Sequence, residues 1–95
     1  MLVAWRSNED GIVAMKQGRY EHASRRFRDA VARIPEPPYF LNLCMSLYKE
    51  GKFSEALNAC NAIDKNNPKA TTKSKADQMN VRIKEAARQQ GITAP

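Results

Sequence analysis

The stretch Gly18–Pro35, which reads GRYEHASRRFRDAVARIP, is matched later in the chain by Gly51–Pro68, which reads GKFSEALNACNAIDKNNP. Both stretches open with glycine, carry an aromatic residue two positions later and alanine three positions after that, and end in proline. Upstream of them, Gly11 corresponds to Cys44 at the same offset of 33 residues. A period of about 33–34 residues is typical of stacked helical repeats, which usually bind other proteins rather than catalyse reactions.

Apolar residues at helical spacing predict an all-α fold of antiparallel hairpins, because no segment alternates as a strand does. Ser7 is expected to start the first helix, and the alternative is an extra leading turn that includes Trp5. Gly18 and Gly51 are expected to end the first and third helices, since glycine enters the left-handed region without a penalty. Prolines end the second and fourth, because the residue before a proline is pushed out of the helical region. The expected helices span residues 7–17, 20–33, 39–50, 53–65 and 71–90.

The composition, 95 residues of which 42% are hydrophobic, fits one small domain with a modest core. No stretch approaches about 18 consecutive apolar residues, so we expect no membrane span. Arg6 interrupts the short apolar start, which is too short for a secretory leader, and we therefore expect a cytoplasmic protein.

The net charge is +6, from 16 Lys/Arg and 10 Asp/Glu, and the basic excess is concentrated after Lys65. A basic tail either attracts nucleic acid or an acidic partner, or is the solvated face of a helix. The tail has no aromatic residue on which a base could stack, which makes nucleic acid the less favoured partner.

Motifs that carry catalysis are missing from the sequence. There is no nucleophile elbow, no phosphate loop and no pair of histidine ligands, so we expect no enzyme and no cofactor. Two cysteines are too few for a disulfide framework or a zinc site.

The spacing of these residues resembles the tetratricopeptide repeat, a helical hairpin of about 34 residues. The resemblance rests on Gly11, Gly18, Tyr20, Ala23, Phe27, Ala30 and Pro35 in one unit and on Phe40, Cys44, Gly51, Phe53, Ala56, Cys60, Ile63 and Pro68 in the next. It implies one domain of two repeats, over about residues 4–36 and 37–70, stacked as a short right-handed superhelix. It also places Cys44 and Cys60 across one hairpin, where we expect reduced, buried thiols; a redox switch is the alternative.

Over about residues 71–90, the sequence predicts a charged helix with one apolar stripe that includes Met79 and Ile83. Repeat stacks need a terminal unit with a polar outer face, so this helix is expected to cap the second hairpin. The alternative is that the helix binds a target itself.

The first helix of each hairpin lines a concave surface in proteins of this family. From the positions that match it, the predicted partner-binding residues are Asn8, Ile12, Met15, Leu41, Asn42, Met45, Tyr48 and Lys49, with Trp5, Glu9, Lys16 and Pro38 also on this face. The apolar members are expected to form one continuous groove for a peptide or an amphipathic helix, flanked by Asn42 and Lys49. The chain would then act as a protein-binding adaptor or scaffold.

Two further alternatives concern this surface. Some family members clamp a carboxylate with lysine and asparagine, but this chain has Asn8 and Ile12 at two of those positions, so no such clamp is expected. The groove could instead be covered by the chain's own tail or by a second copy, and Met1, Leu2, Val3 and Trp5 are candidates for self-association.

Overall fold

The computed structural model describes residues 3–65 and 70–89, and the predictions that concern Met1, Leu2 and Pro68 lie outside these ranges. The described chain forms five helices and no strand, so the all-α prediction is confirmed for it. The helices are α1 (Ala4–Lys16), α2 (Tyr20–Arg33), α3 (Pro37–Lys49), α4 (Phe53–Lys65) and α5 (Ala70–Gln89). In the described ranges, none of them is long and apolar enough to cross a bilayer.

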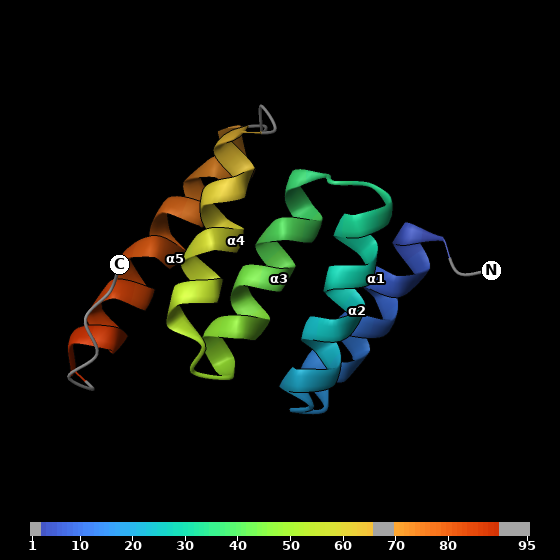
Figure 1. Ribbon diagram of the computed structural model, residues 1–95, viewed down its shortest axis with the longest axis horizontal. Coiled ribbons are helices and arrows are strands. Elements are labelled where there is room, and N and C mark those ends of the chain that lie inside the picture. The colour runs from blue at the N-terminus through green and yellow to red at the C-terminus, as the bar shows by residue number, and fades with distance from the viewer. Residues whose placement is uncertain (1–2, 66–69, 90–95) are drawn as a thin grey trace.

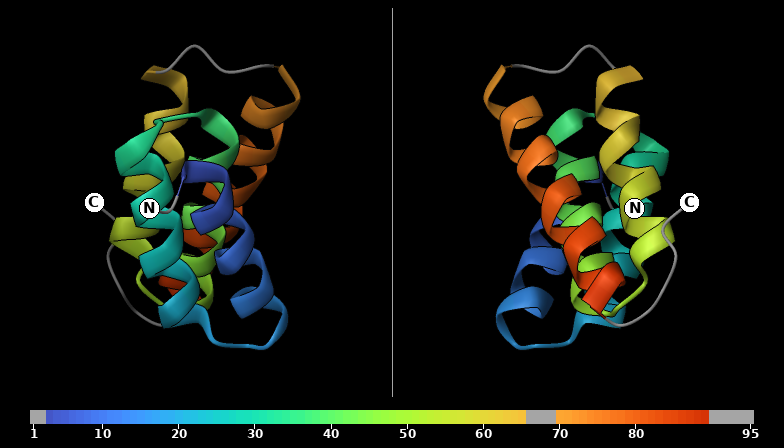
Figure 2. Two further views of the ribbon diagram at one scale, coloured as in Figure 1. Left: turned by 90° about the vertical axis from the view of Figure 1, so that its right-hand side faces the viewer. Right: turned by 90° about the vertical axis from the view of Figure 1, so that its left-hand side faces the viewer.

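The helices form two layers. Consecutive helices pack against each other in antiparallel pairs, and α3 also packs between α1 and α5. As Figures 1 and 2 show, α1, α3 and α5 therefore make one layer, and α2 and α4 make the other. One broad face of the molecule is built from the first helix of each hairpin together with α5.

Turn residues end the helices where the sequence predicts. Gly18 follows α1 with φ of 75°, and Gly51 follows α3 with φ of 82°. Both values lie in the left-handed region that glycine adopts without strain, which confirms the two predicted stops. Pro37 stands in the first turn of α3, where its missing N–H costs nothing.

The predicted start of the first helix is wrong. The helix α1 begins at Ala4, with Val3 as the N-cap residue, so Trp5 is helical and Ser7 lies inside the helix. Ser7 is fully buried, and its hydroxyl donates a hydrogen bond to Oδ2 of Asp29 on α2. A serine near an apolar run can be a cap or a buried contact between helices, and the local sequence does not distinguish these roles.

Within the first hairpin, α1 and α2 approach closely at Gly11. A Cβ atom placed on Gly11 would lie 2.4 Å from Cε1 of Phe27, whose ring is buried. Real Cβ atoms do not come this close to another heavy atom, so the aromatic ring uses the space that glycine leaves.

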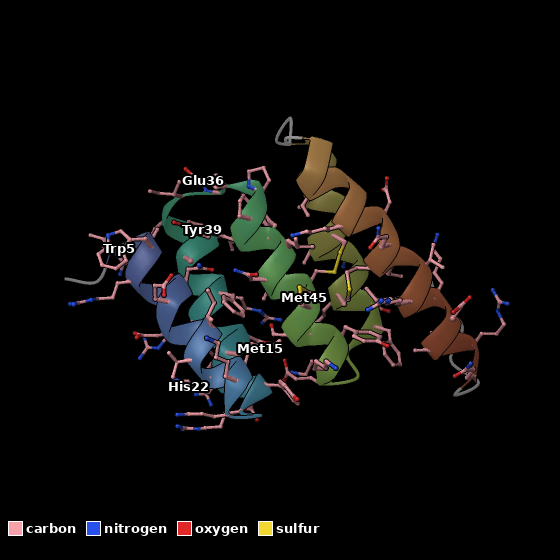
Figure 3. All side chains as sticks on the ribbon, turned by 180° about the vertical axis from the view of Figure 1, so that it is seen from behind. Trp5, Met15, His22, Glu36, Tyr39 and Met45 are labelled. Carbon is pink, nitrogen blue, oxygen red and sulfur yellow. A yellow bond between two sulfur atoms is a disulfide. The ribbon has the colours of Figure 1, made fainter. Side chains whose placement is uncertain are left out.

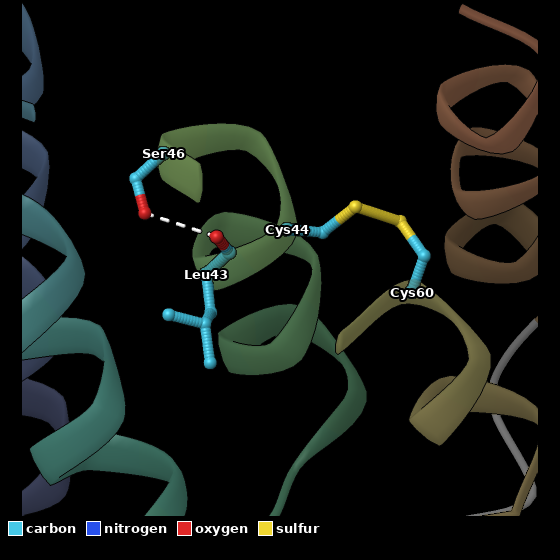
Figure 4. Close-up of a disulfide and its surroundings, with 4 residues drawn as sticks. All are labelled: Leu43, Cys44, Ser46 and Cys60. Atoms are coloured by element: carbon cyan, nitrogen blue, oxygen red, sulfur yellow. Dashed lines mark hydrogen bonds between the residues drawn. A yellow bond between two sulfur atoms is a disulfide. The ribbon is translucent and has the colours of Figure 1, made fainter. Parts of the chain in front are cut away.

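Within the second hairpin, Cys44 of α3 and Cys60 of α4 occupy the corresponding positions and form a disulfide, with their Cα atoms 5.4 Å apart (Figure 4). The two residues are 0% and 2% exposed, so the bond lies inside the core. The expectation of reduced thiols is therefore wrong for this structure. The resemblance brings the two side chains together, but the spacing of residues does not report the oxidation state.

A polar network joins the two hairpins. Ser24 on α2 donates its single hydroxyl proton to the carboxylate of Glu50, and its oxygen lies 2.8 Å from the hydroxyl oxygen of Ser46 on α3. Ser46 donates to the carbonyl oxygen of Leu43 at 3.0 Å (Figure 4). Both serines are buried, so these bonds satisfy groups that would be costly to leave unpaired.

The helix α5 packs against both α3 and α4. Met79, Ile83 and Ala87, which are 8%, 0% and 0% exposed, enter the same core cluster as the disulfide. This confirms the prediction that Met79 and Ile83 pack on the second hairpin.

Candidate functional site

A pocket of about 170 Å³ lies between α1 and α3, on the face formed by α1, α3 and α5. Its lining residues are Ile12, Met15, Lys16, Phe27, Asn42 and Met45. In Figure 3, which shows this face, Met15 and Met45 lie on the two neighbouring helices. Sites for drug-sized ligands are about 300–1,000 Å³, so this pocket has room for one apolar side chain rather than a small-molecule ligand.

Asn42 and Asn8 connect the two helices at this pocket. Nδ2 of Asn42 donates to Oδ1 of Asn8 at 2.8 Å. Among the described residues, Oδ1 of Asn42 and Nδ2 of Asn8 have no further partner. Oδ1 of Asn42 can therefore still accept and Nδ2 of Asn8 can still donate, as a peptide unit of a bound segment requires.

A second pocket lies further along α3, where Tyr48, Lys49, Gly51 and Phe53 meet Ala86 of α5. The rings of Tyr48 and Phe53 are 6.1 Å apart between centroids, in a tilted arrangement. Met45 and Tyr48 are three residues apart on α3 and so lie on neighbouring turns of one face. A bound segment that crosses α3 would contact both pockets.

The structure separates the predicted site residues. Ile12, Met15, Asn42 and Met45 line the first pocket, Asn8 contacts it through Asn42, and Tyr48 and Lys49 line the second. Leu41 is only 8% exposed and belongs to the core cluster, so the expectation that it forms part of an exposed groove is wrong. That the two pockets belong to one continuous groove stays a prediction.

Sequence reasoning missed two contributors to the site. Phe27 was expected only as a core residue, but its ring also forms part of the first pocket. Ala86 belongs to the apolar stripe of α5, and that stripe gave no sign that it would reach the second pocket. Trp5 lies at the far end of α1 in Figure 3, 59% exposed, with the Arg6 guanidinium 5.9 Å from its ring centroid.

One carboxyl group has a perturbed pKa. Asp29 accepts a hydrogen bond from Ser7 and another from Nε of Arg33 at 3.1 Å, and these contacts lower the pKa of its carboxyl group. The Ser7 bond is the larger cause. Through its bond with Ser7, Asp29 links α2 to α1, and it lines neither of the two pockets.

Within the described ranges, no group of three or more His, Cys, Asp or Glu side chains is arranged to hold a metal ion. Comparisons of the chain with protein-family models, with curated proteins and with solved structures give no match. The resemblance to the tetratricopeptide repeat therefore stays a prediction.

Proposed function

We propose that this chain is a non-catalytic protein-binding module that holds a peptide or a helix of a partner protein on the face of α1, α3 and α5. The observation that carries the proposal is the pocket between α1 and α3, where Ile12, Met15 and Met45 surround a space for one side chain. Met45 is 37% exposed, although burial of apolar surface is favourable. Methionine adapts its shape to different apolar partners, which suits this role.

The proposal includes a tetratricopeptide-like arrangement of the hairpins. Two features support it: the alternation of the helices between two layers, and the glycine stops at corresponding positions of the two hairpins. The close contact at Gly11 and the buried stripe of α5 are the packing that such a stack needs. An adaptor or scaffold role would follow from this arrangement.

A different class of function, binding of nucleic acid or an acidic partner through α5, has one observation in its favour. Arg82, Lys84 and Arg88 of α5 are exposed and have no ion-pair partner among the described residues. Salt distinguishes the two functions, because phosphate binding weakens steeply as salt rises and binding in an apolar pocket does not.

Location and self-association stay predictions. Disulfides persist mainly in oxidising compartments, so the Cys44–Cys60 bond does not favour the cytoplasmic location that the sequence predicts. Val3 and Trp5, 47% and 59% exposed, are accessible for the predicted contact between copies.

The proposal can be tested by selecting peptides from a large displayed library against the folded, oxidised chain. The selected peptides should lose binding to the variant Met45→Glu, which places a charge in the first pocket. The matched control is Val13→Glu, the same kind of change at an exposed α1 residue that does not line the pocket. Equal binding to both variants would show that the pocket between α1 and α3 does not hold the selected peptides, which would refute the proposal.

A further inference from the structure

Charges are balanced differently in the two layers of the structure. The four ion pairs of the described residues lie on α2 and α4 or in the turn between α3 and α4: Glu21 with Arg25, Arg28 with Glu55, Asp29 with Arg33, and Glu50 with Lys52. No described residue of α1, α3 or α5 takes part in one. Charged side chains without an ion-pair partner are therefore concentrated in the layer that carries both candidate pockets, and they include the carboxylates Glu9, Asp10, Asp77 and Glu85 as well as the cations.

The unpaired cations of this layer border the two pockets. Lys16 lines the first pocket and Lys49 lines the second, and both are exposed. Arg82 is also exposed and lies one helical turn before Ala86, so it shares the face of α5 that reaches the second pocket. Positive side chains from three helices thus border the small apolar first pocket and the second pocket, which is larger, at about 330 Å³, and more polar.

Glu50 also lines the second pocket, but it does not cancel this charge. Its side chain is 9% exposed, it accepts a hydrogen bond from Ser24, and Nζ of Lys52 lies 3.4 Å from its Oε1. Its charge is therefore already compensated by Lys52, while Lys49 has no partner among the described residues.

We infer that the segment bound on this face is an acidic peptide segment of a partner protein with one apolar anchor. The anchor enters the pocket of Ile12, Met15 and Met45, and internal Asp or Glu side chains on both sides of it contact Lys16, Lys49 and Arg82. The inference rests on the proposed function and adds the chemistry of the ligand. A peptide suits the site better than nucleic acid, because the pocket is apolar and holds one side chain, and the free donor and acceptor of Asn8 and Asn42 match a peptide unit.

The test uses fluorescence anisotropy with the whole oxidised chain and designed peptides blocked at both ends, so that no terminal carboxylate takes part. The first peptide carries one leucine flanked by glutamates. The second has glutamine in place of every glutamate, and the third has serine in place of the leucine. Both changes should weaken binding by more than about tenfold, because the charge and the anchor each contribute. If the glutamine peptide binds as well as the first, the inference is wrong.

Charge reversal locates the binding surface. The double variant Lys49→Glu with Arg82→Glu should lose more than about tenfold in affinity for the first peptide. The matched control is Lys84→Glu with Arg88→Glu, which makes the same change in net charge at exposed residues of α5 outside both pockets, and it should bind normally. Circular dichroism checks that both variants stay helical. An equal loss in both would overturn the inference, because it would indicate general attraction to a basic protein.

Nucleic acid is a separate outcome. A single-stranded RNA of similar length provides this test. If the RNA binds more tightly than the first peptide, and if the control variant no longer binds it, the inference is overturned and nucleic-acid binding through α5 is favoured. The inference can also fail while the proposed function holds. This would be the case if the selected library peptides need Met45 for binding but carry no acidic residues.

Discussion

The Cys44–Cys60 bond offers the sharpest test of the structure, because it can be broken by reduction, which changes the composition of the core only by two hydrogen atoms. The bond joins α3 to α4 within the second hairpin, and both cysteines are buried. Reduction removes no heavy atom, although the two sulfur atoms must move apart to non-bonded contact. The loss of stability on reduction therefore reports the cross-link together with this local repacking rather than a cavity.

The size of the effect follows from the loop that the bond closes. The two cysteines are 16 residues apart in the chain. In the chain-entropy account, a cross-link across such a loop restricts the unfolded state by about 3 kcal/mol. For a domain of this size, each kcal/mol corresponds to about 4–8 °C in melting temperature, so reduction should lower the melting temperature by about 12–24 °C.

The assay is thermal unfolding followed by circular dichroism at the helical band. Because the bond is buried, a reductant reaches it only when the hairpin opens, so the sample is reduced in denaturant and refolded in the presence of the reductant. A thiol count on the denatured chain confirms the state of each sample. The control is the double variant Cys44→Ala with Cys60→Ala, whose melting temperature should not respond to the reductant.

Two results would refute the reasoning. If two thiols titrate in the purified, air-exposed chain after denaturation, the bond is absent from the protein. If the reduced and oxidised chains melt within a degree or two of each other, the bond exists but does not stabilise the hairpin. The second result would mean that packing alone holds α3 against α4.

Three other changes test individual contacts. Gly11→Ala should destabilise the chain by up to about 2 kcal/mol in urea unfolding, because overpacking against Phe27 costs about 1–3 kcal/mol and a gain in helix propensity of about 1 kcal/mol offsets part of it. Ile83→Ala should cost about 2–5 kcal/mol, and a change below about 0.5 kcal/mol would show that α5 is not part of the core. Asp29, whose pKa is lowered, contributes stability that is present above its ordinary pKa and is lost as the pH falls through the lowered one. Ser7→Ala should therefore raise the pKa of Asp29 in an NMR titration, and an unchanged value would exclude the hydrogen bond as its cause.

The helices and their order could be predicted because the signals are local. Gly18 and Gly51 are required by backbone conformations that other residues rarely adopt, and Pro35 cannot lie inside a helix. The start of α1 could not be predicted in the same way. Ser7 resembles a cap residue in sequence, and only the position of Asp29 on the neighbouring helix makes it a buried contact instead.

The candidate site was only partly predictable, because exposure depends on the neighbours of a helix. Leu41 and Met45 are one turn apart on α3 and have similar hydrophobicity, yet they are 8% and 37% exposed. A repeat pattern identifies the helix face but not how far α1 and α5 cover it. The unpaired cations Lys16 and Lys49 could not be recognised either, since a lysine without an ion-pair partner is a property of the folded surface.

The two hairpins solve the same packing problem with different side chains, and this leads to a final prediction. Gly11 faces Phe27 in the first hairpin, and at the corresponding positions of the second hairpin Cys44 is bonded to Cys60.

In the single variant Cys60→Phe, the new ring meets the side chain of Cys44, and this contact should destabilise the chain. Adding Cys44→Gly removes that side chain and recreates the contact of the first hairpin, so the double variant should be more stable than additivity predicts. The expected coupling is about 1–3 kcal/mol, measured by urea unfolding of the wild type in the reduced state, both single variants and the double variant. Strict additivity would mean that the hairpins are not equivalent at this contact, and the repeat would then be a resemblance of sequence without a common packing.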